Sequence, residues 1–132
     1  MGGMASDDRE GPLATRADSS VPAQISRAIV QMLARYTGRG PTKAKTTVDS
    51  GHVLVVLEDT LTTGERSLVE AGEGEHVRRQ RETFDRLMRD EAVEAVESAT
   101  GRRVRVMLSD IDPEGGVALK LFLFDSPADP RG

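Results

Sequence analysis

One short segment combines residue types that could bind an anion. It reads YTGRGP over residues 36–41, and two lysines follow it. A guanidinium between two glycines, with lysines nearby, could hold bicarbonate or phosphate. However, the segment follows a predicted helix C-terminus, whose dipole repels anions, and it lacks the GxxxxGK[ST] phosphate loop. We therefore interpret it first as a helix stop and turn, and second as an anion-binding or partner-binding loop. That loop comprises Tyr36, Gly38, Arg39, Gly40, Pro41, Lys43 and Lys45.

Residues that could do other chemistry are few. The chain has no cysteine and only two histidines, His52 and His76. Disulfides, thiol catalysis, cysteine-ligated metals and multi-histidine sites are therefore excluded. His52 could act as a general base, but no carboxylate or nucleophile is placed with it. The acidic run of Asp110, Asp112 and Glu114 lacks the spacing of a calcium loop and predicts a solvated turn. We expect no catalytic residues, no metal and no cofactor, and hence no enzyme.

Charge and aromatic content argue against nucleic-acid binding. The net charge is −4, and residues 22–124 hold 15 basic and 16 acidic side chains. Binding to nucleic acid is driven by neutralisation of phosphates, which a nearly neutral domain supports poorly. The chain has no Trp, one Tyr and three Phe, so stacking platforms for bases are hard to build. We expect no nucleic-acid partner.

Hydrophobic periodicity predicts the elements that position these residues. A helix should begin at Pro22 and end at Gly38, and Thr62 with Glu65 matches a capping box at the start of a second, short helix. We expect Gly51 to take a left-handed conformation in a hairpin turn. In chain order, the predicted elements are a helix from 22, strands 42–48 and 52–58, a short helix from 62, a long helix over 75–99, and strands 102–109 and 117–124.

This order predicts an α+β fold. It consists of a four-stranded antiparallel sheet with two main helices packed on one face, in the order α-β-β-α-α-β-β. We expect a disordered N-terminal tail over residues 1–21, a single domain over 22–124 and a frayed C-terminal tail over 125–132. No apolar run is long enough to span a membrane, and no signal peptide precedes the domain, so we expect a cytoplasmic protein without direct membrane insertion.

Both faces of the predicted sheet are apolar. We expect the helices to cover the set formed by Val104, Val106, Leu108, Val117, Leu119, Leu121 and Leu123. The other face would then show Met107, Lys120, Phe122 and Phe124. A face this apolar favours an interface, so we expect a second copy or a partner to cover it. Of these two possibilities, we expect the second copy, and hence a homodimer.

The sequence resembles the MpsC-like family, the C component of a sodium-translocating, membrane-potential-generating system. The resemblance rests on ISRAIVQMLARYTGRGPTKAKTTV over 25–48, VVLEDTLTTGERSLVEAG over 55–72 and TGRRV over 100–104. It spans about residues 22–124. It implies a companion of a membrane pair linked to cation translocation and inorganic-carbon uptake, and it supplies no catalytic residues.

These observations lead us to expect a non-enzymatic cytoplasmic accessory or regulatory protein. It would dock to a membrane transporter subunit or to itself, and could lie at the inner face of the membrane through that partner. One alternative is a sensor of a small anion such as bicarbonate or phosphate, with Arg39, Lys43 and Lys45 as ligands. A further alternative is a nucleic-acid-binding module, which would show steep salt dependence.

Overall fold

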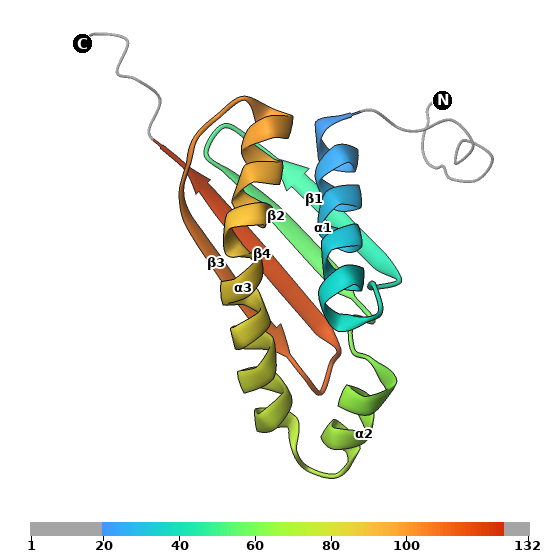
Figure 1. The fold of residues 1–132 in the computed structure, drawn as a ribbon. Helices are drawn as coiled ribbons and strands as arrows, with labels where there is room; N and C mark the ends of the chain where they lie inside the picture. The colour runs from blue at the N-terminus through green and yellow to red at the C-terminus, as the bar shows by residue number, and fades with distance from the viewer. Residues whose placement is uncertain (1–19, 126–132) are drawn as a thin grey trace, which may run out of the picture.

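The computed structural model describes residues 20–125, which form a single sheet with helices against it (Figure 1). The element order confirms the predicted α+β class. The elements are α1 (Val21–Thr37), β1 (Lys43–Val48), β2 (His52–Glu58), α2 (Thr63–Glu70), α3 (Gly74–Thr100), β3 (Val104–Asp112) and β4 (Val117–Phe124).

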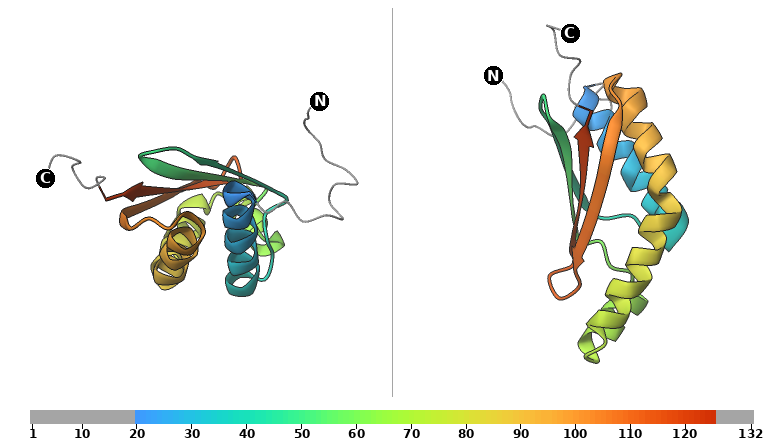
Figure 2. Two further views of the ribbon diagram at one scale, coloured as in Figure 1. Left: turned by 90° about the horizontal axis from the view of Figure 1, so that it is seen from above. Right: turned by 90° about the vertical axis from the view of Figure 1, so that its left-hand side faces the viewer.

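The four strands are all antiparallel to their neighbours, in the order β1-β2-β4-β3. After β2 the chain passes through α2 and α3 to the far edge, where β3 forms, and β4 returns between β3 and β2. Figure 2 shows α1 and α3 side by side on one face of the sheet, while α2 lies beyond its lower end. Within residues 20–125 no helix covers the opposite face, which we call the open face.

Helix ends form where the sequence predicts them. The Ser20 side chain accepts a hydrogen bond from the backbone N–H of Ala23, and Gly38 ends α1 in the left-handed region at φ 87°. Thr62 and Glu65 form both hydrogen bonds of the predicted capping box. These caps fix where α1 and α2 meet the loops beside the sheet.

The turn between β1 and β2 differs from our expectation. Gly51 is not among the described glycines that adopt a positive φ. Instead, the Asp49 carboxylate accepts hydrogen bonds from the backbone N–H groups of Gly51 and His52, at 2.8 and 2.9 Å. Local side-chain bonding of this kind shapes a turn without a left-handed residue.

The two faces of the sheet are inverted relative to our prediction. The side chains we predicted to be open are buried beneath the helices: Met107 and Lys120 are 3% exposed, Phe122 is 0% and Phe124 is 4%. By contrast, Leu108 is 55% exposed and is the most exposed apolar side chain of the sheet. Strand alternation assigns residues to two faces, but it does not say which face is covered, and both faces of β4 are apolar.

A register shift in β3 adds to this inversion. Val104 pairs with Phe124 and Val106 pairs with Leu123, so one extra residue is accommodated between them. Such a bulge moves the following side chains to the other face. Val104 and Met107 therefore both pack against the core, although they are three residues apart. A strictly alternating β3 could not place both of them there.

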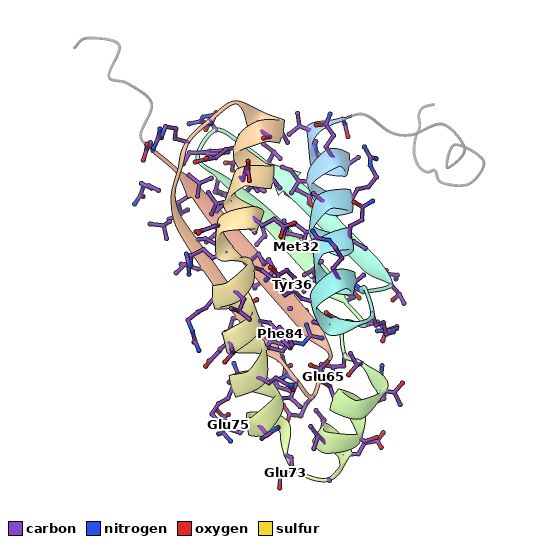
Figure 3. All side chains as sticks on the ribbon, in the orientation of Figure 1. Met32, Tyr36, Glu65, Glu73, Glu75 and Phe84 are labelled. Atoms are coloured by element: carbon purple, nitrogen blue, oxygen red, sulfur yellow. The ribbon has the colours of Figure 1, made fainter. Side chains whose placement is uncertain are left out.

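The core lies between the helix pair and the sheet. Figure 3 shows Tyr36 of α1 and Phe84 of α3 in the space between the two helices. The described chain begins at Ser20 and ends at Asp125, at the same end of the molecule (Figure 1). The tails we predicted over 1–21 and 125–132 lie outside the described residues, except for three residues: Ser20 caps α1, Val21 already belongs to it, and the backbone N–H of Asp125 donates to the carbonyl of Arg103.

Candidate functional site

A lysine is buried on the helix-covered face of the sheet. The Nζ atom of Lys120 lies 2.7 Å from a carboxylate oxygen of Asp85 in α3. The Asp85 side chain is 26% exposed. Burying an ammonium group is tolerable only when it is paired, and this ion pair satisfies that requirement. The hydroxyl of Ser109, the β3 residue in register with Lys120, is buried without a hydrogen-bond partner in the described structure. The ion pair joins β4 to α3.

A second buried ion pair joins α2 to α3. The guanidinium of Arg81 donates from Nε and Nη2 to the two carboxylate oxygens of Glu65, each at 2.8 Å, and also to the backbone carbonyl of Thr60. Burial by itself would raise the pKa of Glu65, but the hydrogen bonds from Arg81 and from the Thr62 N–H outweigh it, and the pKa lies below its ordinary value. Glu65 therefore takes part both in the capping box of α2 and in the ion pair with Arg81.

Arg39 is engaged within its own chain. Its Nη1 donates to the backbone carbonyls of Asp59 and Leu61 at 2.6 and 2.9 Å, and its Nη2 donates to the Asp59 carboxylate at 2.9 Å. Asp59 has a positive φ of 53°, a backbone conformation that is uncommon for residues other than glycine. The Arg39 contacts thus hold the sharp bend that leads from β2 to α2.

The residues of the predicted anion loop do not converge on one point. Tyr36 packs against the core, Gly38 caps α1 and Pro41 is buried. Lys43 and Lys45 lie in β1, at exposed positions of the open face. Arg39 instead reaches Asp59 and Leu61. Anion binding by this loop stays a prediction, and the described geometry gives it no gathered set of cationic ligands.

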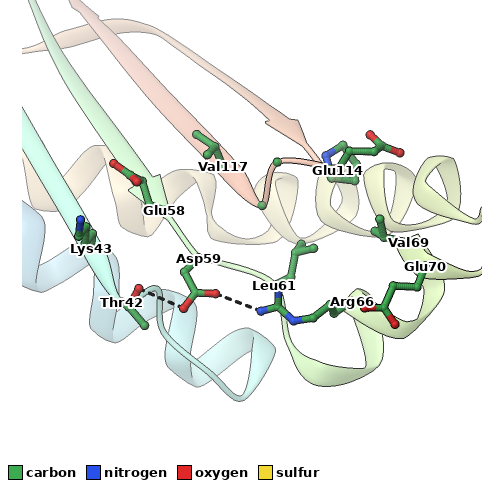
Figure 4. Close-up of a pocket in the computed structure, with 13 residues that line it drawn as sticks. Thr42, Lys43, Glu58, Asp59, Leu61, Arg66, Val69, Glu70, Glu114 and Val117 are labelled. Carbon is green, nitrogen blue, oxygen red and sulfur yellow. Dashed lines mark hydrogen bonds and ion pairs between the residues drawn. The ribbon is translucent and has the colours of Figure 1, made fainter.

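A cleft of about 540 Å³ lies at the lower end of the sheet (Figure 4). Asp59 stands in it and accepts hydrogen bonds from Thr42 at 3.1 Å and Arg66 at 3.0 Å. The hydrogen bond from Arg39, followed by those from Arg66 and Thr42, lowers the pKa of Asp59. The lining residues are Thr42, Lys43, Glu58, Asp59, Leu61, Arg66, Val69, Glu70 and residues 113–117. Among the described residues, no group of three or more acidic or histidine side chains could hold a metal ion.

The open face carries a broad apolar surface. Its rows run across the strands from β1 through β2 and β4 to β3. The row nearest the cleft holds Lys43, Glu58, Val117 and Asp112; the next holds Lys45, Val56, Leu119 and Asp110; the third holds Thr47, Leu54, Leu121 and Leu108. The central positions are mainly leucine and valine, whereas both ends of the first two rows are charged. This surface is the candidate functional site that the geometry supports best.

Sequence reasoning missed the Arg81–Glu65 pair, although a signal for it was present. Arg81 lies four residues after Val77 and seven before Met88, so helical spacing places it on the buried stripe of α3. A charged residue in such a stripe requires a buried partner. The run of charged residues around Arg81 instead suggests a solvated face, which conceals this signal.

The structure therefore defines an α+β domain with one apolar sheet face that its own described helices leave open. None of the helices within residues 20–125 is long and apolar enough to cross a membrane. A family model described as "Na+-translocating membrane potential-generating system (MpsC)" matches residues 17–126, and the chain belongs to this MpsC family. This confirms the resemblance drawn from the sequence. No curated protein and no solved structure shows a significant match to the chain.

Proposed function

We propose that this protein is a non-enzymatic, cytoplasmic accessory component of a Na⁺-translocating, membrane-potential-generating system. It would act at the inner face of the membrane by binding an integral membrane subunit, in a system linked to inorganic-carbon uptake. The observation that carries the proposal is the family match, which spans residues 17–126 and so includes every described helix and strand. The association with Na⁺ translocation thus concerns the whole fold and not a short motif.

The described fold supports an accessory role. Moving an ion across a bilayer requires a path through it, and the described helices do not provide a membrane span. The buried charged side chains, Lys120, Glu65 and Arg81, are engaged in pairing with one another or with Asp85. These groups hold elements together, which suits a protein that presents a surface to a partner.

Inside-out membrane vesicles from the native cells provide a direct test. Vesicles from a strain that lacks this protein should develop little Na⁺-dependent potential, and the purified protein added to their outer, cytoplasmic side should restore it. The protein should also sediment with these vesicles in a fixed ratio to one membrane subunit. Vesicles lacking that subunit serve as the control and should bind none.

Two results would refute the proposal. One is an undiminished Na⁺-dependent potential in vesicles from the deletion strain. The other is a lost potential that the added protein does not restore, together with no binding to the vesicles.

A further inference from the structure

The open face is about as large as the largest apolar patch of an ordinary monomer, a kind of surface that often marks an interaction site. Strand spacing of about 4.8 Å and a rise of about 3.4 Å per residue give four strands of seven residues a flat footprint of roughly 450 Å². This footprint lies within the range of about 300–600 Å² typical of such a patch. The apolar side chains on it are Leu54, Val56, Val106, Leu108, Val117, Leu119, Leu121 and Leu123.

Charges at the two edges of this face are opposite in sign. On the β1 edge lie Lys43 and Lys45, and on the β3 edge lie Asp112 and Asp110. The register places Lys43 in one row with Asp112, and Lys45 in the next row with Asp110. Asp110 also accepts a hydrogen bond from Arg78 at 2.7 Å, which leaves Asp112 as the less compensated of the two aspartates. One edge of the open face is thus basic and the other is acidic.

We propose that the open face binds the open face of a second copy of this chain, with the two-fold axis parallel to the strands. This axis runs between β2 and β4 and exchanges the two edges. Lys43 of one copy then faces Asp112 of the other, while Lys45 faces Asp110. Each charged contact occurs twice, and the side chains between them, mainly leucine and valine with Glu58 in the row nearest the cleft, meet as two sheets stacked about 10 Å apart.

The direction of the axis follows from the charges. An axis across the strands would place β1 over β1 and β3 over β3, which brings the lysines of two copies to one side and the aspartates to the other. Like charges facing each other across an interface are unfavourable. The axis along the strands avoids this repulsion and pairs every edge with its opposite.

Residues 1–19 are a poor cover for this face. Their apolar side chains larger than alanine are only Met1, Met4 and Leu13. Three scattered side chains cannot match a surface of eight leucines and valines, so a second copy, which supplies the same eight, is the better occupant. The inference stands apart from the proposed function, because it concerns the purified protein alone.

The first test measures the mass of the purified full chain by analytical ultracentrifugation. At about 100 µM we expect twice the chain mass of 14.3 kDa, and Leu119→Asp should raise the dissociation constant roughly 30-fold or more. Leu87→Asp is the matched control, because Leu87 is also exposed but lies on α3. It should leave the dissociation constant unchanged, and circular dichroism should show both variants folded. A monomeric wild type, or a Leu119→Asp dimer as tight as the wild type, would overturn the proposal.

The second test determines the axis and does not depend on Leu119→Asp folding. Because the chain has no cysteine, Lys45→Cys and Asp110→Cys each create a unique thiol. A bis-maleimide linker of about 10 Å should join the two variants when they are mixed, and join neither variant to itself. In a dimer of one variant alone, the two thiols lie at opposite edges, three strand spacings apart and beyond this reach. Cross-linking of Lys45→Cys to itself, with none in the mixture, would overturn the proposed arrangement.

Discussion

The two faces of the sheet differ in where they place polar and apolar side chains. The helix-covered face carries Lys120, whereas the open face of the same strand carries Leu119 and Leu121. A buried lysine is acceptable because Asp85 of α3 neutralises it, whereas the exposed leucines of the open face are of the kind that favours an interface. The contrast teaches that one residue's polarity is a weak guide to its face when its partner lies far away in the sequence.

The largest expected difference between the faces is in folding stability. Phe122→Ala should lower the free energy of unfolding by about 3–5 kcal/mol, because it empties a fully buried position beneath the helices. Leu108→Ala on the open face should lower it by less than about 1 kcal/mol when the protein is monomeric. Urea unfolding at low protein concentration measures both. Equal losses in the two variants would contradict the assignment of faces.

The buried ion pair between α2 and α3 should come next. Arg81→Leu leaves the Glu65 carboxylate buried without its cationic partner, so we expect a loss of about 3 kcal/mol. Arg35→Leu is the control, because Arg35 forms an exposed pair with Glu91 and its replacement should change the stability little. Thermal unfolding of the two variants should differ clearly. If they unfold alike, the Arg81 pair does not hold α2 to α3.

Lys120 offers a finer test of the covered face. Lys120→Met should lower the free energy of unfolding by about 1 kcal/mol, since Asp85 is left without its partner but retains some contact with solvent. Adding Asp85→Leu should recover much of that loss, because an apolar pair then replaces the ion pair. A double-mutant cycle from chemical unfolding gives the coupling between the two sites. Additive effects would show that the pair contributes nothing.

The smallest expected effect is the dependence of stability on pH. The pKa values of Asp59 and Glu65 are lowered in the folded protein, so these groups stabilise it above their unfolded values of about 3.9 and 4.3. That stabilisation should be lost as the pH falls through the lower folded values. Unfolding measured from pH 7 to about 3 should show a decline in the acidic range. Glu65→Gln should flatten the decline, and Glu82→Gln, at an exposed position of α3, is the matched control.

Local signals in the sequence determined most of the fold. The helices could be predicted from the caps at Gly38 and Thr62 and from the hydrophobic periodicity of α3. Each of these signals depends only on residues that are close together in the chain. The faces of the sheet could not be read in this way. They depend on the bulge before Val106 and on the pairing of Lys120 with Asp85, 35 residues away.

The candidate site shows the same division. An apolar surface in need of cover could be predicted from the content of the strands, but the residues predicted for it, Phe122 and Phe124 among them, lie on the other face. The role of Arg39 was also beyond the sequence, because its partner Asp59 becomes its neighbour only when the bend after β2 forms. The covered face of the sheet and the partner of Arg39 are both determined by contacts between residues that are far apart in the sequence, and residue type alone does not predict such contacts.

Ser20 and Asp125 lie at one end of the molecule, while the cleft lies at the other. A two-fold axis parallel to the strands preserves this direction in both copies. The proposed dimer is therefore a polar particle, with Ser20 and Asp125 of both copies at one pole and two clefts at the opposite pole. A surface tether attached at Ser20 or at Asp125 would orient every particle alike, with both clefts directed away from the point of attachment.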